Sequence, residues 1–278
     1  MVDLLDMIAE MFSFTFMRRA IIVGLLVSLC AALLGVNLVL KRYAMIGTGL
    51  SHVGFAAMAI AGVIDMAPLS LSMPVVIGTA FLLLRLSESN RINGDSAVAL
   101  ISTSGLAIGV IIVSLTTGLT LHICNIMFGS IFAMTPADMY LSVVLCIVVL
   151  GVFVLFYKQL FSVTYDEDFA KATGIKVEAY KSLLAILTAV TVVLGMRMMG
   201  ALLIASLTLF PALSAMRICK RFLSVVVSSA IIGVSCFFVG MLFSYGLDLP
   251  PGASVVGVNL VLFTALCAIG FVKRGGLK

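Results

Sequence analysis

The sequence predicts an all-α protein with many membrane-spanning helices, which form a single transmembrane domain over residues 1–278. Of its residues 63% are hydrophobic and only 10% are charged, whereas a typical soluble domain is about half apolar and about a quarter charged. The mean hydropathy is +1.28. So few charges cannot coat a globule of this size with polar surface, so lipid must solvate most of its exterior. A soluble fold is therefore excluded.

Nine apolar runs are candidates for spanning a bilayer core, which takes roughly 20 helical residues. They are 20–40, 44–64, 69–86, 96–115, 139–157, 182–196, 200–216, 222–245 and 252–272. The sixth and seventh belong to one stretch of 35 residues, 182–216, interrupted only by Arg197 and Pro211. Because that stretch is too long for one helix, we expect two short spans that meet in a tight turn near residues 195–200, with an exposed Arg197. Eight spans is the alternative count.

A shorter apolar segment, 123–134, precedes the fifth span. Its 12 residues fit a short interfacial or re-entrant helix better than a span. Asp138 follows, two residues after Pro136, at the start of the fifth span. An aspartate in front of a first helical turn is typical of an N-cap. Attraction of a metal cation is the alternative role for Asp138.

The basic residues indicate the orientation of the chain. Under the predicted topology, 14 of the 17 lysines and arginines fall on one side of the membrane, and the positive-inside rule makes that side, with the C-terminus, cytoplasmic. They lie in short gaps between spans and not in one patch, so the net charge of +5 gives no indication of nucleic-acid binding. Arg197 falls on the outer side and is a candidate contact for an extracellular protein.

The longest cytoplasmic segment contains a predicted short helix at about residues 164–176. Three acidic residues, Asp166, Glu167 and Asp168, precede Lys171, and Gly174 follows. Acidic residues at the start, a lysine later and a glycine at the end are the signals of a short helix outside the membrane. This helix either docks a cytoplasmic partner or is a solvated loop helix without one.

A second feature is the polar group around His52. His52 is the ninth residue of the 21-residue run 44–64, which places it near the bilayer centre. Polar groups at that depth are costly and normally face a partner or a water-filled path, and imidazole is a favoured zinc ligand. His52 therefore lies on a metal path, with Thr48 and Ser51 beside it, or is hydrogen-bonded to a neighbouring helix. Gly47, Ser51 and Gly54 form a small-residue strip that lets another helix approach closely.

Five segments in order carry a family resemblance. They are LVLKR followed by MIGTGLSH at 38–52, MFGSIFAMTPAD at 127–138, DEDFAKATGI at 166–175, GALLIASLTLFPALSA at 200–215 and DLPPGASVV at 248–256. With these segments the chain resembles the membrane subunits of the ABC-3 family, the bacterial ABC importers for zinc and manganese of the ZnuB/MntB type.

The resemblance implies an assembly in a bacterial cell membrane. Two copies of the permease would sit on two cytoplasmic ATPase subunits, and an extracellular metal-binding solute-binding protein would deliver a divalent transition metal, with Arg197 as a candidate contact. The segment at 164–176 would be the coupling helix that docks on the ATPase. Its matching residues are Asp166, Glu167, Asp168, Phe169, Ala170 and Gly174.

The chain itself contains no Gly-Lys dipeptide, so it has no phosphate-binding P-loop. We therefore expect ATP and magnesium to bind to the partner subunit, and no cofactor or enzymatic activity in this chain. Similar permeases often carry an aspartate where this chain has Thr48, four residues before His52. Without that aspartate the site lacks one hard ligand, so we expect it to bind a metal ion less tightly. The missing oxygen ligand also favours zinc as the cargo, because manganese prefers oxygen ligands.

Two other classes of protein fit the sequence less well. A secondary transporter usually places several ionisable groups at the membrane midplane, whereas His52 is nearly alone there. A membrane enzyme would need a nucleophile and a base that face each other. Ser51 and His52 are adjacent on a helix and diverge by about 100°, so they cannot form such a dyad.

Overall fold

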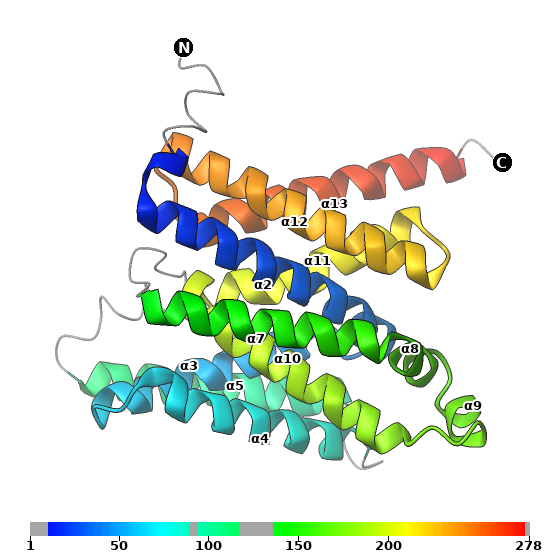
Figure 1. Ribbon diagram of the computed structural model, residues 1–278, viewed down its shortest axis with the longest axis horizontal. Coiled ribbons are helices and arrows are strands. Elements are labelled where there is room, and N and C mark those ends of the chain that lie inside the picture. The colour runs from blue at the N-terminus through cyan, green and yellow to red at the C-terminus, as the bar shows by residue number, and fades with distance from the viewer. Residues whose placement is uncertain (1–10, 89–93, 117–135, 276–278) are drawn as a thin grey trace.

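The computed structural model describes residues 11–88, 94–116 and 136–275, and within these ranges the chain is helical and contains no strand (Figure 1). Its long helices are α2 (Thr15–Leu40), α3 (Ile46–Val63), α4 (Pro68–Glu88), α5 (Gly94–Leu115), α7 (Pro136–Leu155), α10 (Val177–Met199), α11 (Ala201–Ile218), α12 (Phe222–Leu247) and α13 (Pro251–Gly275). Two short helices, α8 (Tyr157–Tyr165) and α9 (Glu167–Ala172), lie between α7 and α10. The predicted all-α membrane fold is confirmed.

In the described part of the chain, eight helices are long and apolar enough to cross a membrane, and the bent pair of α7 and α8 raises the number to as many as nine. Both predicted counts are therefore compatible with the structure. The predicted re-entrant segment 123–134 lies outside the described residues.

Two predicted boundaries differ from the structure, and a third agrees with it. The fifth span does not reach residue 157, because α7 ends at Leu155 and the chain turns by 68° into α8. The sixth span extends over the whole of α10, so Arg197 lies in the last turn of that helix and is half-buried, not exposed in a loop. The tight turn between the sixth and seventh spans is confirmed at Gly200, whose φ of 85° suits a residue without a Cβ.

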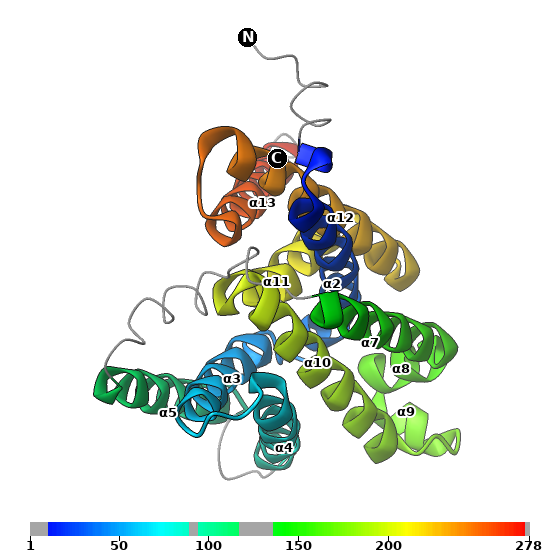
Figure 2. The same ribbon diagram turned by 60° about the vertical axis from the view of Figure 1, so that its left-hand side comes forward.

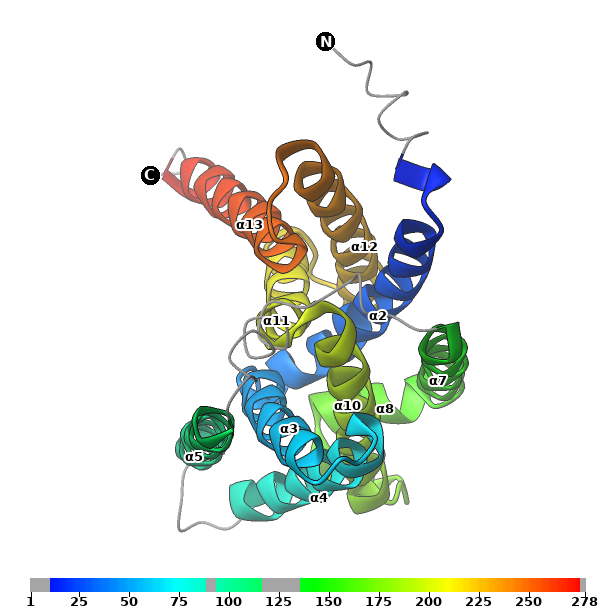
Figure 3. The same cartoon turned by 90° about the vertical axis from the view of Figure 1, so that its left-hand side faces the viewer.

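Four helices form the centre of the bundle. α11 contacts α2, α3, α10, α12 and α13. α4 and α5 flank α3 on one side, and α12 and α13 lie on the other side of α2 and α11 (Figures 2 and 3). More than half of the spanning residues of α2, α3, α10 and α11 are buried, against 17% for α13. The outer helices therefore present most of their side chains to lipid.

Glycines allow some of these central helices to approach closely. A Cβ added at Gly35 of α2 would lie 2.0 Å from the backbone oxygen of Thr208 in α11. Close backbone approach through small residues is the usual way in which helices pack in lipid. A hydrogen bond also joins helices here, since Ser229 Oγ in α12 donates to the carbonyl oxygen of Ala32 in α2 at 2.9 Å.

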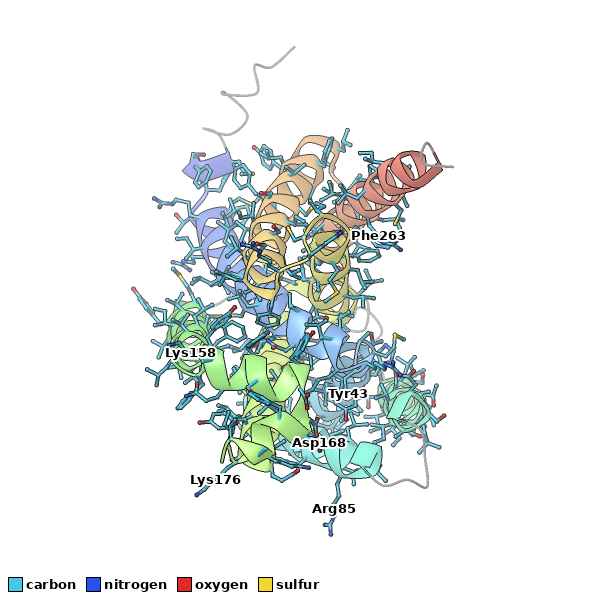
Figure 4. All side chains as sticks on the ribbon, turned by 90° about the vertical axis from the view of Figure 1, so that its right-hand side faces the viewer. Tyr43, Arg85, Lys158, Asp168, Lys176 and Phe263 are labelled. Atoms are coloured by element: carbon cyan, nitrogen blue, oxygen red, sulfur yellow. The ribbon has the colours of Figure 1, made fainter. Side chains whose placement is uncertain are left out.

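The ends of the molecule differ in charge. The α2–α3 turn, the end of α4, helices α8 and α9, the α11–α12 turn and the end of α13 lie at one end, on the right of Figure 1. We call this the α9 end. It collects the loops in which the sequence concentrates lysine and arginine, and Figure 4, viewed from this end, labels Arg85, Lys158, Lys176 and Asp168 on it.

Candidate functional site

Helix α9 begins with a capped first turn. Asp166, in extended conformation (φ −148°, ψ 107°), precedes the helix, and its carboxylate accepts a hydrogen bond from the backbone N–H of Phe169 at 2.9 Å. This is the geometry of an N-cap, which satisfies one of the free N–H groups at a helix start. Glu167 and Asp168 lie in the first turn and Lys171 in the last, as the sequence predicts. These charges complement the helix dipole.

Gly174 ends the helix in the left-handed conformation, with a φ of 81°. Its N–H donates to the carbonyl of Lys171 at 3.0 Å, and the N–H of Ile175 donates to the carbonyl of Ala170 at 3.0 Å. This pair of hydrogen bonds is a Schellman motif, and its usual apolar contact is present because Ile175 packs near Ala170. The exposed Gly174 therefore has a structural role, because it allows the backbone to end α9 in this conformation.

The inner face of α9 packs against the helices on either side of it. Ala170 is completely buried in a small apolar cluster with Val163 of α8 and Val177 of α10. Thr164 of α8 adds a polar contact, because its hydroxyl donates to Oδ1 of the buried Asn37 in α2 at 3.0 Å. The six-residue helix is therefore held in place by contacts with α8 and α10, and α8 is in turn hydrogen-bonded to α2.

Glu167 makes the strongest polar contacts of α9. One carboxylate oxygen lies 3.0 Å from Nζ of Lys41, which follows α2, and the other lies 2.7 Å from Nζ of Lys181 in α10. Partial burial alone would raise the pKa of Glu167, but the hydrogen bonds and charges of Lys181 and Lys41 outweigh it and lower the pKa. The carboxylate is therefore ionised at neutral pH and bound by both ammonium groups.

The outer face of α9 is left open. Asp168 and Phe169 are exposed, as is Tyr165 at the end of α8, and the Phe169 side chain is 61% accessible. Figure 4 shows Asp168 at the α9 end of the molecule. Of the six residues predicted to dock on a partner, Asp168 and Phe169 thus have side chains free to do so, whereas Ala170 faces the protein interior and Glu167 is bound to lysines.

His52 lies on α3 and its imidazole contacts α5. Nδ1 of His52 is 2.7 Å from Oγ of Ser102, and the two helices lie side by side (Figure 3). The expected contact between His52 and a neighbouring helix is therefore present, and the imidazole is half-buried. Sequence reasoning did not single out Ser102, although it belongs to a polar Ser-Thr-Ser triplet, 102–104, inside an otherwise apolar run.

The predicted small-residue strip on α3 is in contact with other helices. A Cβ at Gly47 would lie 2.9 Å from Oγ1 of Thr208 in α11, and one at Gly54 would lie 2.5 Å from Cε of Met196 in α10. Ser51 is fully buried, and its hydroxyl donates to the carbonyl of Thr48 in its own helix at 2.9 Å. The strip is therefore a packing surface of α3 against α10 and α11, and His52 and the half-buried Thr48 lie beside it.

Two predicted site residues lie apart from this group. Asp138 falls inside α7, whose described part starts at Pro136, so the predicted N-cap role is wrong. Arg197 lies at the far end of α10 from α9. Within the described ranges, no cluster of three or more His, Cys, Asp or Glu side chains has a geometry that could hold a metal ion.

Comparisons with known proteins agree with this architecture. The profile of the ABC 3 transport family matches residues 13–270. The manganese transport system membrane protein MntC of Halalkalibacterium halodurans is 26% identical over 268 residues, which cover 96% of this chain and 91% of that protein. The high-affinity zinc uptake system membrane protein ZnuB of Haemophilus influenzae is 29% identical over 250 residues, or 90% and 96% of the two chains.

A solved structure is also similar. A chain of PsaBC from Streptococcus pneumoniae, in complex with Fab, superposes with a TM-score of 0.82 at 25% identity and covers 93% of this chain and 95% of its own length. The match therefore concerns the entire helix bundle and not a fragment of it. Because the family profile extends over nearly the whole sequence, this protein belongs to the ABC 3 transport family.

Proposed function

We propose that this chain is the membrane permease subunit of an ATP-driven importer for a divalent transition metal, zinc ahead of manganese. The membership of the ABC 3 transport family carries the proposal, and the names of its manganese and zinc relatives support the class of cargo. Two copies of the permease would form the channel by homodimerisation, and an external metal-binding protein would supply the ion, with Arg197 as a docking contact.

The energy would come from a separate cytoplasmic ATPase that docks on α9. The closed inner face and open outer face of α9 support this role, because a docking element must be fixed to its own protein and still expose contacts. Phe169 is 61% accessible, and an exposed aromatic side chain is a typical anchor of a protein interface. Asp168 beside it adds a charge for pairing with a basic residue of the partner.

The lysines and arginines at the α9 end support a cytoplasmic location of that end and of the C-terminus by the positive-inside rule. Labelling of an Asp168→Cys variant tests this orientation, with a cysteine at the outer α12–α13 turn, Leu249→Cys, as the control. A membrane-impermeant thiol reagent should reach Cys at 168 only in opened cells and Cys at 249 in intact cells. The reverse pattern would refute the orientation.

The path of the ion would pass His52. Nε2 of its imidazole is available for a metal when Ser102 is hydrogen-bonded to Nδ1, and an imidazole held through its other nitrogen is the common arrangement of histidine ligands. A single imidazole with a hydroxyl such as Thr48 binds weakly, which suits a path that must release its cargo. Asp138 at the start of α7 is a further candidate for attracting the cation.

Uptake of radioactive zinc by cells tests the site. We expect His52→Ala to reduce uptake by about tenfold or more, the usual cost of removing a ligand or its support, while the permease remains in the membrane with its ATPase. Ser51→Ala is the matched control, because the Ser51 hydroxyl donates its hydrogen bond within α3, to the carbonyl of Thr48. Uptake by this variant should stay near the wild-type rate. Normal uptake by His52→Ala would show that His52 does not lie on the metal path.

A further inference from the structure

Two buried lysines share one carboxylate at the α9 end. The side chains of Lys41 and Lys181 are only 5% and 9% exposed, and both reach Glu167, at 3.0 and 2.7 Å. Removing an ammonium group from water is costly unless an opposite charge and hydrogen bonds replace the water. Glu167 supplies these for both lysines. The exposed Glu178 lies farther from Lys181, at 3.8 Å.

These three residues come from distant parts of the chain. Lys41 directly follows α2, Lys181 lies in the first turns of α10, and Glu167 is the first residue of α9. The salt bridge between Lys41 and Glu167 spans 126 residues of sequence. One carboxylate therefore joins the helix that would meet the ATPase to the ends of two central helices of the bundle.

The two lysines also lie next to the start of α3. Lys41 and Lys181 line a small cavity together with Ile46 and Leu50 of α3. Leu50 is fully buried and lies two residues before His52 on the same helix. A shift of the lysines would thus press on, or open space beside, the first turns of the helix that carries His52, because packed interiors transmit displacement.

We propose that Glu167 is the positioning residue that transmits movement of α9 to α2, α10 and the start of α3. This inference rests on the proposed function, since it assumes that a partner ATPase moves α9. Glu167 itself touches neither the ion nor the ATPase. Its ionised carboxylate makes α9 and the two lysines move together. Closure of the ATPase therefore displaces the residues around His52.

The test uses the full permease with its ATPase in lipid nanodiscs and compares Glu167→Gln with Glu178→Gln. Both variants remove one carboxylate near Lys181, but only the first removes the shared partner of both lysines. Hydrogen exchange at residues 46–52 is measured with and without ATP, using an ATPase variant that binds ATP but does not hydrolyse it. We expect ATP to change this exchange in the wild-type protein and in Glu178→Gln, and not in Glu167→Gln.

Transport supplies a second measurement. In Glu167→Gln, the complex should still assemble and hydrolyse ATP, but the zinc transported per ATP should fall by about tenfold, a common size for the coupling between two sites. Glu178→Gln should keep the wild-type ratio. A purely structural role for Glu167 would lower assembly and ATP hydrolysis along with transport, so the unequal loss distinguishes the two roles.

Loss of the carboxylate that both buried lysines share could prevent Glu167→Gln from folding. The triple variant Lys41→Met, Glu167→Gln, Lys181→Met removes that penalty, because replacing a buried ionic group by apolar side chains is often tolerated. We expect the triple variant to fold and assemble but to remain uncoupled.

Three results would overturn the inference. They are an ATP-dependent change at 46–52 that persists in Glu167→Gln, a wild-type ratio of zinc to ATP in the triple variant, and no ATP-dependent change at 46–52 in the wild-type protein. Failure of the wild-type complex to carry any metal would instead contradict the proposed function, and the exchange measurement would still decide the role of Glu167.

Discussion

The C-terminal cap of α9 allows a sharp prediction for Gly174→Ala. Gly174 adopts a φ of 81°, and a Cβ added there would meet no atom within 4 Å. A steric clash is therefore absent, and the cost of alanine is that of the left-handed backbone alone, about 1 kcal/mol. The two hydrogen bonds of the Schellman motif, from Gly174 and Ile175, depend on this conformation.

Hydrogen exchange of the purified permease measures this cost. A loss of about 1 kcal/mol corresponds to roughly fivefold faster exchange of the α9 amides, given that ~1.4 kcal/mol is tenfold. Gly174→Asn should lose less, because asparagine tolerates the left-handed region better than alanine. Gly151→Ala is the matched control, since Gly151 too has open space around it but lies inside helix α7, where φ is not positive.

The ranking of the variants decides the outcome. We expect α9 to exchange fastest in Gly174→Ala, more slowly in Gly174→Asn, and at the wild-type rate in Gly151→Ala. Unchanged α9 exchange in Gly174→Ala would refute the reasoning, and so would equal losses for alanine and asparagine. In transport assays the same alanine variant should loosen the coupling between ATP hydrolysis and uptake.

Three further predictions concern packing, the histidine contact and pH. Gly35→Ala would bring a Cβ to 2.0 Å from a backbone oxygen of Thr208, so it should destabilise the bundle by about 1–3 kcal/mol and lower its melting temperature in detergent; Gly78→Ala, where nothing lies within 4 Å, should not. Ser102→Ala should reduce zinc uptake less than His52→Ala, because it removes the hydrogen bond that orients the imidazole but leaves the ligand; equal uptake in Ser102→Ala and the wild type would show that this contact is dispensable. The lysines lower the pKa of Glu167 in the folded protein, so its stabilising effect is complete above the ordinary carboxylate pKa of about 4.3 and is lost as the pH falls through the lowered value. The difference in melting temperature between the wild type and Glu167→Gln should therefore shrink in acid, and a constant difference down to the lowest pH would contradict the ion-pair geometry.

Local features of the fold were predictable from the sequence because they depend on neighbouring residues. The capped start of α9 at Asp166 and its end at Gly174 follow from residue types at fixed spacing. The apolar runs likewise predicted the spans. The bend between α7 and α8 was missed, because residues 156–165 contain no proline or glycine that would mark it.

Contacts between distant residues could not be predicted in this way. Ser102 is 50 residues from His52, and Glu167 is 126 residues from Lys41. Nothing in a single sequence shows which helices become neighbours, so the partner of the histidine and the shared carboxylate appeared only in the folded bundle. The burial of Ala170 was hidden for the same reason, because it depends on how α8 and α10 fold around α9.

The most direct test of the account is metal uptake by sealed vesicles that contain the permease together with its partner ATPase and external binding protein. We predict that zinc accumulates only when ATP reaches the ATPase side, and that Phe169→Ala on the outer face of α9 lowers this uptake by weakening the docking of the ATPase. Two results would contradict the account. One is accumulation of zinc by the permease alone, and the other is uptake that does not depend on ATP and stops when an ionophore dissipates the ion gradient.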